Sequence, residues 1–174
     1  ITTKGMKAEI HCVEKNAFRT VVEICHEMMI PSGMGEELQR QREMCIDPYT
    51  RVANRSKELV PMEVKTVLTL EKSGKGLHVA TTICNQAKDH RVRVVMPTGL
   101  NTSTHLADSA FEVVKRNNRH NDTWTNPCGC ERQQCFAAME DETNGLLVAN
   151  RGLYEYEVLA DEENAIAVTL LRSV

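Results

Sequence analysis

A compact run of charged residues in the middle of the chain is the first place where the sequence could do chemistry. Lys88, Asp89, His90 and Arg91 follow one another between two strand-like runs, and Arg93 comes two residues later. A neighbouring carboxylate and imidazole could act as a general acid and base. The two arginines alternate with valines, so both lie on one face of a strand, where Asp89 could pair with one of them. We therefore expect Asp89, His90 and the two arginines to form a structural knot of ion pairs and hydrogen bonds where a core strand starts.

The polar segment of residues 117–132 is the richest in side chains that bind ligands. It holds the only tryptophan of the chain, Trp124, among amide and hydroxyl side chains. An aromatic ring can stack on the apolar C–H face of a sugar while amides bind its hydroxyl groups, so this composition is typical of a sugar-facing surface. The alternative is a surface loop whose tryptophan covers an edge of the fold.

Three cysteines gather after this tryptophan. Cys128, Cys130 and Cys135, together with His120 upstream, could supply four soft ligands to a zinc ion. Their spacing matches no common zinc-binding pattern, and we expect three free thiols that bind no metal. The chain has seven cysteines, an odd number, and the other four are scattered along the sequence. This usage favours a reducing cytoplasm over a disulfide framework.

Length and charge exclude several classes of protein. The chain has 174 residues, enough for one domain that needs neither disulfides nor metal to hold its core. Its 21 Lys and Arg residues against 24 Asp and Glu residues give a net charge of −3, which disfavours nucleic acid or an anionic membrane as the main partner. No apolar run approaches the length of a membrane span. No nucleotide-binding glycine pattern, zinc-protease motif or serine-nucleophile motif is present.

The two ends of the sequence predict that it is part of a longer polypeptide. It starts at Ile1, where a native start would leave Met or a small residue, and residues 168–174 stop on an apolar, strand-like run. We expect residues 1–174 to form a single domain of such a polypeptide, with any catalytic part outside it.

Alternation of apolar and polar residues dominates the chain and predicts β-strands. In residues 18–30 it places Val22, Ile24, Met28 and Ile30 on one face of a long strand. Further strand-like runs cover residues 62–71, 77–83, 91–96, 110–115, 133–139, 146–150, 153–159 and 165–171. Strands at this regular spacing, each with one buried face, favour an all-β fold of antiparallel strands in two stacked sheets, a β-sandwich.

Two long segments lack this alternation. They cover residues 32–56 and 117–132, and loops of this length in a compact domain are usually functional or mobile. Only residues 35–44 have a helix-like composition, and they are charged on all sides with no apolar stripe. We therefore expect a loop or a single turn there, and little or no helix in the whole chain.

Four stretches make the sequence resemble a known family. They are residues 60–70 (VPMEVKTVLTL), 85–99 (NQAKDHRVRVVMPTG), 104–116 (THLADSAFEVVKR) and 150–159 (NRGLYEYEVL). Together, and in this order, they resemble the C-terminal all-β region of glycoside hydrolase family 38, the α-mannosidases, and above all its bacterial branch with the mannosylglycerate hydrolases. The resemblance implies a β-sandwich of the galactose-mutarotase-like supersandwich type.

The resemblance implies an enzyme that hydrolyses terminal α-linked mannose with retention, or mannosylglycerate as the alternative substrate. Enzymes of this family use an Asp nucleophile, a second carboxylate as acid and base, and a zinc-type divalent metal. In the family these groups come from a preceding catalytic domain, whose motifs this sequence lacks. The resemblance therefore carries no catalytic residue and no metal ligand onto this chain, and we expect the chain alone to be inactive.

The family's sandwich packs against the catalytic domain, and its loops reach the rim of the substrate pocket. On this chain the loop that fits this role leads to four candidates for contact with an α-mannoside: Trp124, Arg132, Gln133 and Gln134. Some relatives carry an arginine where Gln133 or Gln134 stands here. The expected partners are thus the catalytic domain of the same polypeptide and its carbohydrate substrate. The alternatives are a stand-alone carbohydrate-binding module and a structural domain that mediates oligomer contact.

Overall fold

The computed structural model describes residues 1–52, 54–121, 123–125, 128–160 and 163–173. The chain divides into two compact units. The first unit comprises residues 1–90 together with Ser173, and the second unit comprises residues 91–172. The sequence predicts one domain for residues 1–174, and this division into two units does not test that prediction.

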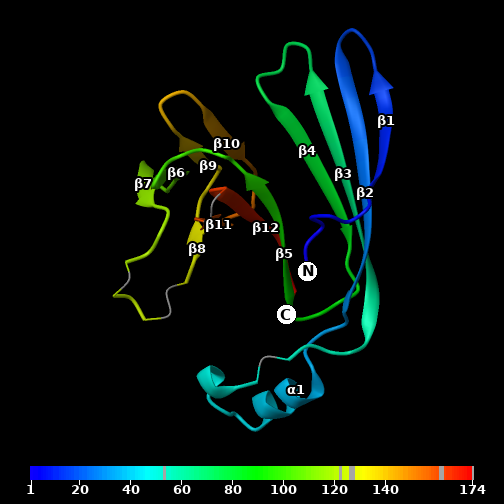
Figure 1. Cartoon of the computed structure of the whole chain (residues 1–174), viewed down its shortest axis with the longest axis vertical. Coiled ribbons are helices and arrows are strands. Elements are labelled where there is room, and N and C mark those ends of the chain that lie inside the picture. The colour runs from blue at the N-terminus through cyan, green and yellow to red at the C-terminus, as the bar shows by residue number, and fades with distance from the viewer. Residues whose placement is uncertain (53, 122, 126–127, 161–162, 174) are drawn as a thin grey trace. The chain divides into compact units, whose positions relative to one another are not determined.

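The first unit is built on one antiparallel sheet of four strands in the order β1-β2-β3-β4 (Figure 1). The strands are β1 (Glu9–Lys15), β2 (Arg19–Pro31), β3 (Leu59–Glu71) and β4 (Leu77–Cys84). The strands predicted at residues 18–30, 62–71 and 77–83 are confirmed. The sequence did not predict β1, because this edge strand is almost wholly exposed and has no buried face to mark it.

One face of this sheet is strongly apolar. β2 and β3 pair in one uninterrupted register, and directly paired residues such as Val22 and Leu68 point to the same side. We call this side the apolar face of the first unit, and its apolar residues are Val22, Ile24, Met28, Ile30, Val60, Met62, Val64, Leu68, Leu70, Leu77, Val79 and Ile83. The face is buried at its Met28 and Met62 end and exposed at Leu77.

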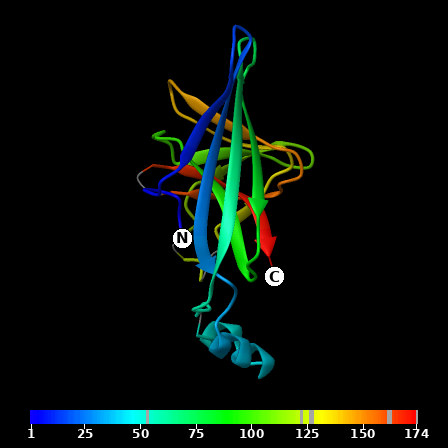
Figure 2. The same ribbon diagram turned by 90° about the vertical axis from the view of Figure 1, so that its right-hand side faces the viewer.

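A short helix stands where the sequence predicts a loop or a single turn. α1 (Glu36–Glu43) and the 3-10 turn η1 (Pro48–Thr50) both lie in the excursion between β2 and β3 (Figure 2). The prediction for residues 35–44 is wrong because this helix needs no apolar stripe, and none of its residues is buried. Acidic residues in its first turn and arginines in its last turn suit the helix dipole, and Glu37 pairs with Arg40 at 2.7 Å. Among the described residues no helix is long and apolar enough to cross a membrane.

The second unit holds two further four-stranded sheets (Figure 1). The sheet with the order β10-β9-β6-β7 is formed by β6 (Thr104–Asp108), β7 (Val113–Asn117), β9 (Phe136–Glu140) and β10 (Gly145–Ala149). The sheet with the order β5-β12-β11-β8 is formed by β5 (His90–Pro97), β8 (Cys130–Arg132), β11 (Glu155–Leu159) and β12 (Ala165–Ser173). The predicted all-β antiparallel fold is confirmed. The described strands form three sheets where the sequence predicts two.

The core of the second unit lies between its two sheets. Ala137 and Met139 enter it from one sheet, and Tyr156, Ile166 and Val168 enter it from the other. Two sheets that share one core make the sandwich that the sequence predicts. Tyr156 is completely buried, so its phenol hydroxyl needs hydrogen-bond partners inside the fold.

Candidate functional site

Asp89 anchors the excursion between β2 and β3. Its carboxylate accepts a hydrogen bond from the Met34 amide at 3.3 Å and lies 3.6 Å from the Arg42 guanidinium. The guanidinium of Arg55 donates to the Asp89 carbonyl oxygen. Asp89 has a φ of 54°, a left-handed conformation that Asp adopts more readily than most residues. The pairing with a strand arginine that the sequence suggests is thus replaced by a contact with Arg42 on α1.

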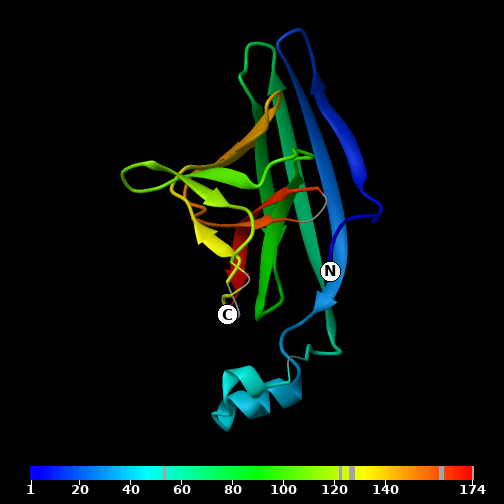
Figure 3. The same cartoon turned by 60° about the vertical axis from the view of Figure 1, so that its left-hand side comes forward.

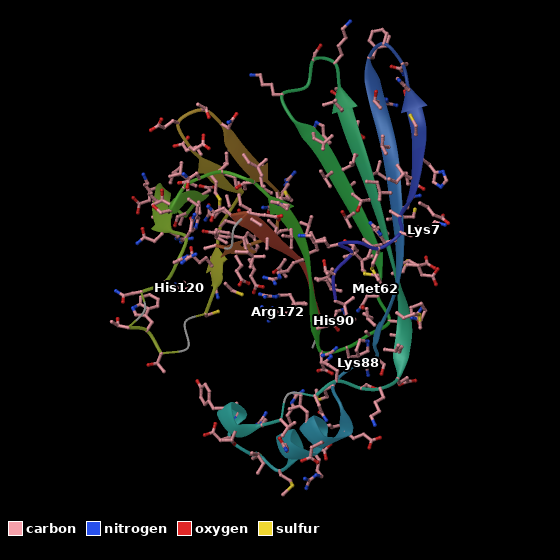
Figure 4. The ribbon with its side chains drawn as sticks, viewed as in Figure 1. Lys7, Met62, Lys88, His90, His120 and Arg172 are labelled. Atoms are coloured by element: carbon pink, nitrogen blue, oxygen red, sulfur yellow. The ribbon has the colours of Figure 1, made fainter. Side chains whose placement is uncertain are left out.

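Lys88 and His90 lie on either side of Asp89, before and at the start of β5 (Figure 4). Nδ1 of His90 is 3.3 Å from the Lys88 carbonyl oxygen, and its Nε2 is buried with no hydrogen-bond partner among the described residues. The Asp89 carboxylate and the His90 imidazole therefore serve different contacts. These contacts support a structural role for the pair more than acid–base chemistry.

The arginines of β5 pair with two carboxylates of β11. Arg91 lies 3.2 Å from Glu155 and 3.1 Å from Glu157, and Arg93 also contacts Glu157. Glu155 and Glu157 are two residues apart on one strand, so they present their carboxylates on the same face. The strand arginines of the predicted knot thus form their ion pairs inside the second unit, with β11 carboxylates in the place of Asp89.

Glu155 is the most connected of these carboxylates. Thr169 donates its hydroxyl to Oε1 at 2.7 Å, and the Arg172 guanidinium lies 2.7 Å from Oε2. The Thr169 hydrogen bond is the largest cause that lowers the pKa of Glu155, and hydrogen bonds from Arg172 and Arg91 add to it. Glu155 therefore stays ionised and acts as a hydrogen-bond acceptor that joins β5, β11 and β12.

The cysteines do not form a metal site in this arrangement. All seven are free thiols. The Cys130 thiol lies 2.6 Å from the Arg91 guanidinium; burial raises the pKa of this thiol, and Arg91 partly opposes that rise. The Cys128 thiol lies 4.0 Å from the Cys130 carbonyl oxygen. Within the described ranges no three His, Cys, Asp or Glu side chains gather as metal ligands would.

A buried polar network crosses the core of the second unit. His105 is 2% exposed; its Nε2 lies 2.8 Å from the Tyr156 hydroxyl, and its Nδ1 lies 3.0 Å from the Asn118 amide oxygen. The same hydroxyl lies 2.8 Å from Arg116 and 3.0 Å from Glu131, which are themselves paired at 2.9 Å. Burial is the largest cause that raises the pKa of Tyr156 well above its usual range, so its hydroxyl is neutral and can donate.

The sequence does not predict this network, because its members come from four separate strands and a loop. His105 and Glu131 are 26 residues apart, and no local spacing pattern connects them. One signal was present: His105 alternates with Leu106 and shares its strand face with the wholly buried Ala107. A polar residue at an inward-facing strand position predicts buried hydrogen-bond partners.

A long loop joins β7 to β8 (Figure 3). Trp124 lies on this loop. The Trp124 indole stacks on the His120 ring, with ring centroids 5.6 Å apart and planes inclined by 20°, and Figure 4 shows His120 on this loop. The pair borders a cavity of about 500 Å³, which is lined by Asn118, Arg119, His120, Asn121, Trp124, Gly129, Glu131, Glu157 and Val158. We call it the loop cavity. Residues 122, 126 and 127 of the predicted loop lie outside the described residues.

The structure separates the four candidates for the substrate rim. Trp124 lines the loop cavity and is 61% exposed. Gln133 is only 3% exposed, and its amide nitrogen donates to the Leu153 carbonyl oxygen at 3.1 Å. Arg132 and Gln134 are exposed on either side of it. Burial of Gln133 disfavours its contact with a sugar at an open rim, and sugar contact by the other three stays a prediction.

Fold and site together define an all-β sandwich domain with an aromatic-lined cavity at a loop. The chain belongs to the family described as "Glycosyl hydrolases family 38 C-terminal domain", whose family model matches residues 4–174. The resemblance seen in the sequence is therefore confirmed, and with it the role of such domains in glycosidases.

Three relatives support this membership. A protein of Halalkalibacterium halodurans, provisionally named a mannosylglycerate hydrolase, is 39% identical over 173 residues, which are 99% of this chain and 19% of that protein. The crystal structure of an alpha-mannosidase from Enterococcus faecalis matches all of this chain and 20% of its own, with a TM-score of 0.94 and 42% identity. A protein in the glycosyl hydrolase family 38 from Enterococcus faecalis matches over the same shares, with a TM-score of 0.91 and 41% identity. The chain thus spans about a fifth of the length of these relatives.

Proposed function

We propose that this chain is the C-terminal sandwich part of a longer α-mannosidase-type glycoside hydrolase, which removes terminal α-linked mannose with retention. One observation carries this proposal: the whole chain superposes on part of an alpha-mannosidase at 42% identity with a TM-score of 0.94. Mannosylglycerate is the alternative substrate, supported by the name of the Halalkalibacterium halodurans relative.

The carboxylates of this chain support an inert role for it in isolation. Retaining hydrolysis needs one carboxylate free to attack the sugar and a second that is protonated in the resting enzyme. Glu155 and Glu157 are instead paired with arginines, and the Oε2 atom of Glu131 is engaged by Arg116 and Tyr156. We therefore place the nucleophile and the acid in the catalytic domain of the same polypeptide.

The zinc-type metal that the family implies has no fitting ligands in the described part of this chain, since no three suitable side chains gather there. In our proposal the metal is held by the catalytic domain, as are the reacting carboxylates.

The apolar face of the first unit supports a role in holding that catalytic domain. Leu70, Leu77 and Val79 are all exposed on it, next to the half-buried Leu68. Contiguous exposed apolar surface of this kind marks interaction sites in soluble proteins. We propose that this face packs against the catalytic domain. We also propose a reducing, cytoplasmic location for the polypeptide, which its seven free thiols support.

The test is a chromogenic α-mannoside assay on two samples, each with added zinc. One sample is the 174-residue chain and the other is the longer polypeptide that contains it. We expect turnover by the longer polypeptide and none by the chain. Turnover by the chain alone would overturn the assignment of the chemistry to another domain, and an inactive long polypeptide would count against α-mannosidase activity.

A further inference from the structure

We propose that the loop cavity of the second unit binds one pyranose ring of a neutral, hydroxyl-rich sugar by itself, with Trp124 as the stacking platform. The inference rests on the proposed function for its choice of sugar, an α-mannoside. It goes further because it assigns sugar binding to named residues of this chain and requires no catalytic domain.

The platform is exposed and held in place. Trp124 keeps 61% of its surface exposed although its ring stacks on His120. An exposed indole that is fixed by a neighbour offers a rigid apolar surface to the C–H face of a sugar ring. The Trp124 amide donates to the Asn121 carbonyl oxygen at 3.0 Å, and the Asn121 side chain accepts from both the amide and the hydroxyl of Thr123. These contacts build a turn that presents the tryptophan.

Two carboxylates of the cavity wall have acceptor capacity left. In the described contacts Glu131 uses Oε2 for Tyr156 and Arg116, and Glu157 uses Oε2 for its arginine partners. The Oε1 atom of each carboxylate thus remains an acceptor that a sugar hydroxyl can use. Because arginines already offset the negative charge, the wall suits neutral hydroxyl groups better than a cation.

Gly129 lies close to one of these oxygens. A Cβ atom on residue 129 would lie 2.8 Å from Oε1 of Glu157, closer than real Cβ atoms approach such an oxygen. No left-handed backbone angle at Gly129 demands a glycine. A side chain at residue 129 would therefore crowd the Glu157 carboxylate at the wall of the cavity.

The wall behind the cavity is rigid. The Asn118 amide oxygen accepts from Nδ1 of His105 at 3.0 Å, and its amide nitrogen donates to the Thr102 carbonyl oxygen at 2.8 Å. Glu131 is fixed by Arg116 at 2.9 Å. A site whose walls are locked by buried hydrogen bonds loses little entropy when a ligand binds, which favours a preformed sugar site.

The experiment uses the single tryptophan of the chain as its reporter. The 174-residue chain is titrated with methyl α-D-mannopyranoside while Trp124 fluorescence is recorded, and saturation-transfer NMR on the sugar gives an independent readout. We expect a saturable change. We expect Trp124→Ala, measured by NMR, and Gly129→Ala, measured by both methods, each to weaken binding at least about tenfold, because a lost platform or a blocked acceptor removes on the order of a stacking or hydrogen-bond contribution.

Tyr154→Ala is the matched control, because Tyr154 is exposed to a similar degree, 63%, in the same unit and outside the cavity. It should bind like the wild type, and far-ultraviolet circular dichroism should show that all variants are folded. Absence of saturable binding by the wild type, or wild-type binding by folded Trp124→Ala, would overturn the inference. A longer polypeptide that hydrolyses α-mannosides while the chain binds no sugar would sink this inference and leave the proposed function standing.

Discussion

His105 and Tyr156 face each other across the core of the second unit, with Nε2 of the imidazole 2.8 Å from the phenol oxygen. Asn118 sets the orientation of the ring. Its amide nitrogen donates to Thr102, so its oxygen is the acceptor and Nδ1 of His105 is the donor. The Tyr156 hydroxyl then joins the imidazole to the Arg116–Glu131 pair.

This connection predicts a large loss of stability in Tyr156→Phe. The substitution keeps the ring and removes the hydroxyl, which leaves His105, Arg116 and Glu131 each short of a buried partner. We expect the free energy of unfolding to fall by about 2 kcal/mol, the range for buried hydrogen bonds to charged groups. Urea denaturation of the chain measures it. Tyr154→Phe removes the same hydroxyl from an exposed tyrosine and should change stability by less than about 0.5 kcal/mol. Equal effects of the two substitutions would show that the network contributes nothing.

The Glu155 carboxylate predicts a pH dependence with a definite sign. Its folded-state pKa lies below its ordinary value, because Thr169 and then Arg172 and Arg91 stabilise the ion. The contribution of Glu155 to the stability of the fold is therefore present above the ordinary carboxyl pKa. It is lost as the pH falls through the folded-state pKa. Glu155→Gln should be less stable than the wild type near neutral pH, and the two should converge on acidification. Thermal melts from about pH 6 to about pH 3 test this. Glu142 is an exposed loop residue, so Glu142→Gln is the control. The difference in stability between this variant and the wild type should not narrow as the pH falls.

Much of the first unit could be predicted from alternation alone. β2 and β3 are long, and buried positions alternate with more exposed ones near Met28, Ile30 and Met62, so residues 18–30 and 62–71 were placed correctly. α1 was missed because it buries no residue and has no hydrophobic period to detect; its surface carries charge pairs such as Glu37–Arg40. The number of sheets was missed because strand patterns do not say how strands are divided among sheets.

The candidate site was only partly predictable for a similar reason. The tryptophan loop carries its own composition signal, and Trp124 does line a cavity. Gln133 was expected at the rim and is buried, because its amide group completes hydrogen bonds of the Leu153 segment that no local pattern reveals. The partner of Asp89 was predicted wrongly. The strand arginines are near it in the sequence, but its carboxylate contacts Arg42, which is distant in the sequence.

Asp89 makes a third prediction, about the excursion that carries α1. Asp89→Ala removes the acceptor of the Met34 amide and the partner of Arg42, and it puts alanine at a left-handed φ. We expect residues 32–56 to be cut by trypsin about tenfold faster, because the anchored state loses on the order of 1.4 kcal/mol. Asp89→Asn keeps an acceptor and tolerates the backbone angle, so trypsin should cut it at a rate between those of the wild type and Asp89→Ala. If alanine and wild type are cut at the same rate, the anchor does not hold this segment.

The measurement that tests the central claim most directly follows the sugar released by the longer polypeptide that contains this chain. Proton NMR, recorded during hydrolysis of an aryl α-mannoside, distinguishes the two anomers of mannose before they equilibrate. A retaining α-mannosidase must release α-mannose first, and the 174-residue chain alone should release none. If β-mannose appears first, or if the longer polypeptide leaves both α-mannosides and mannosylglycerate intact, the proposed function is wrong.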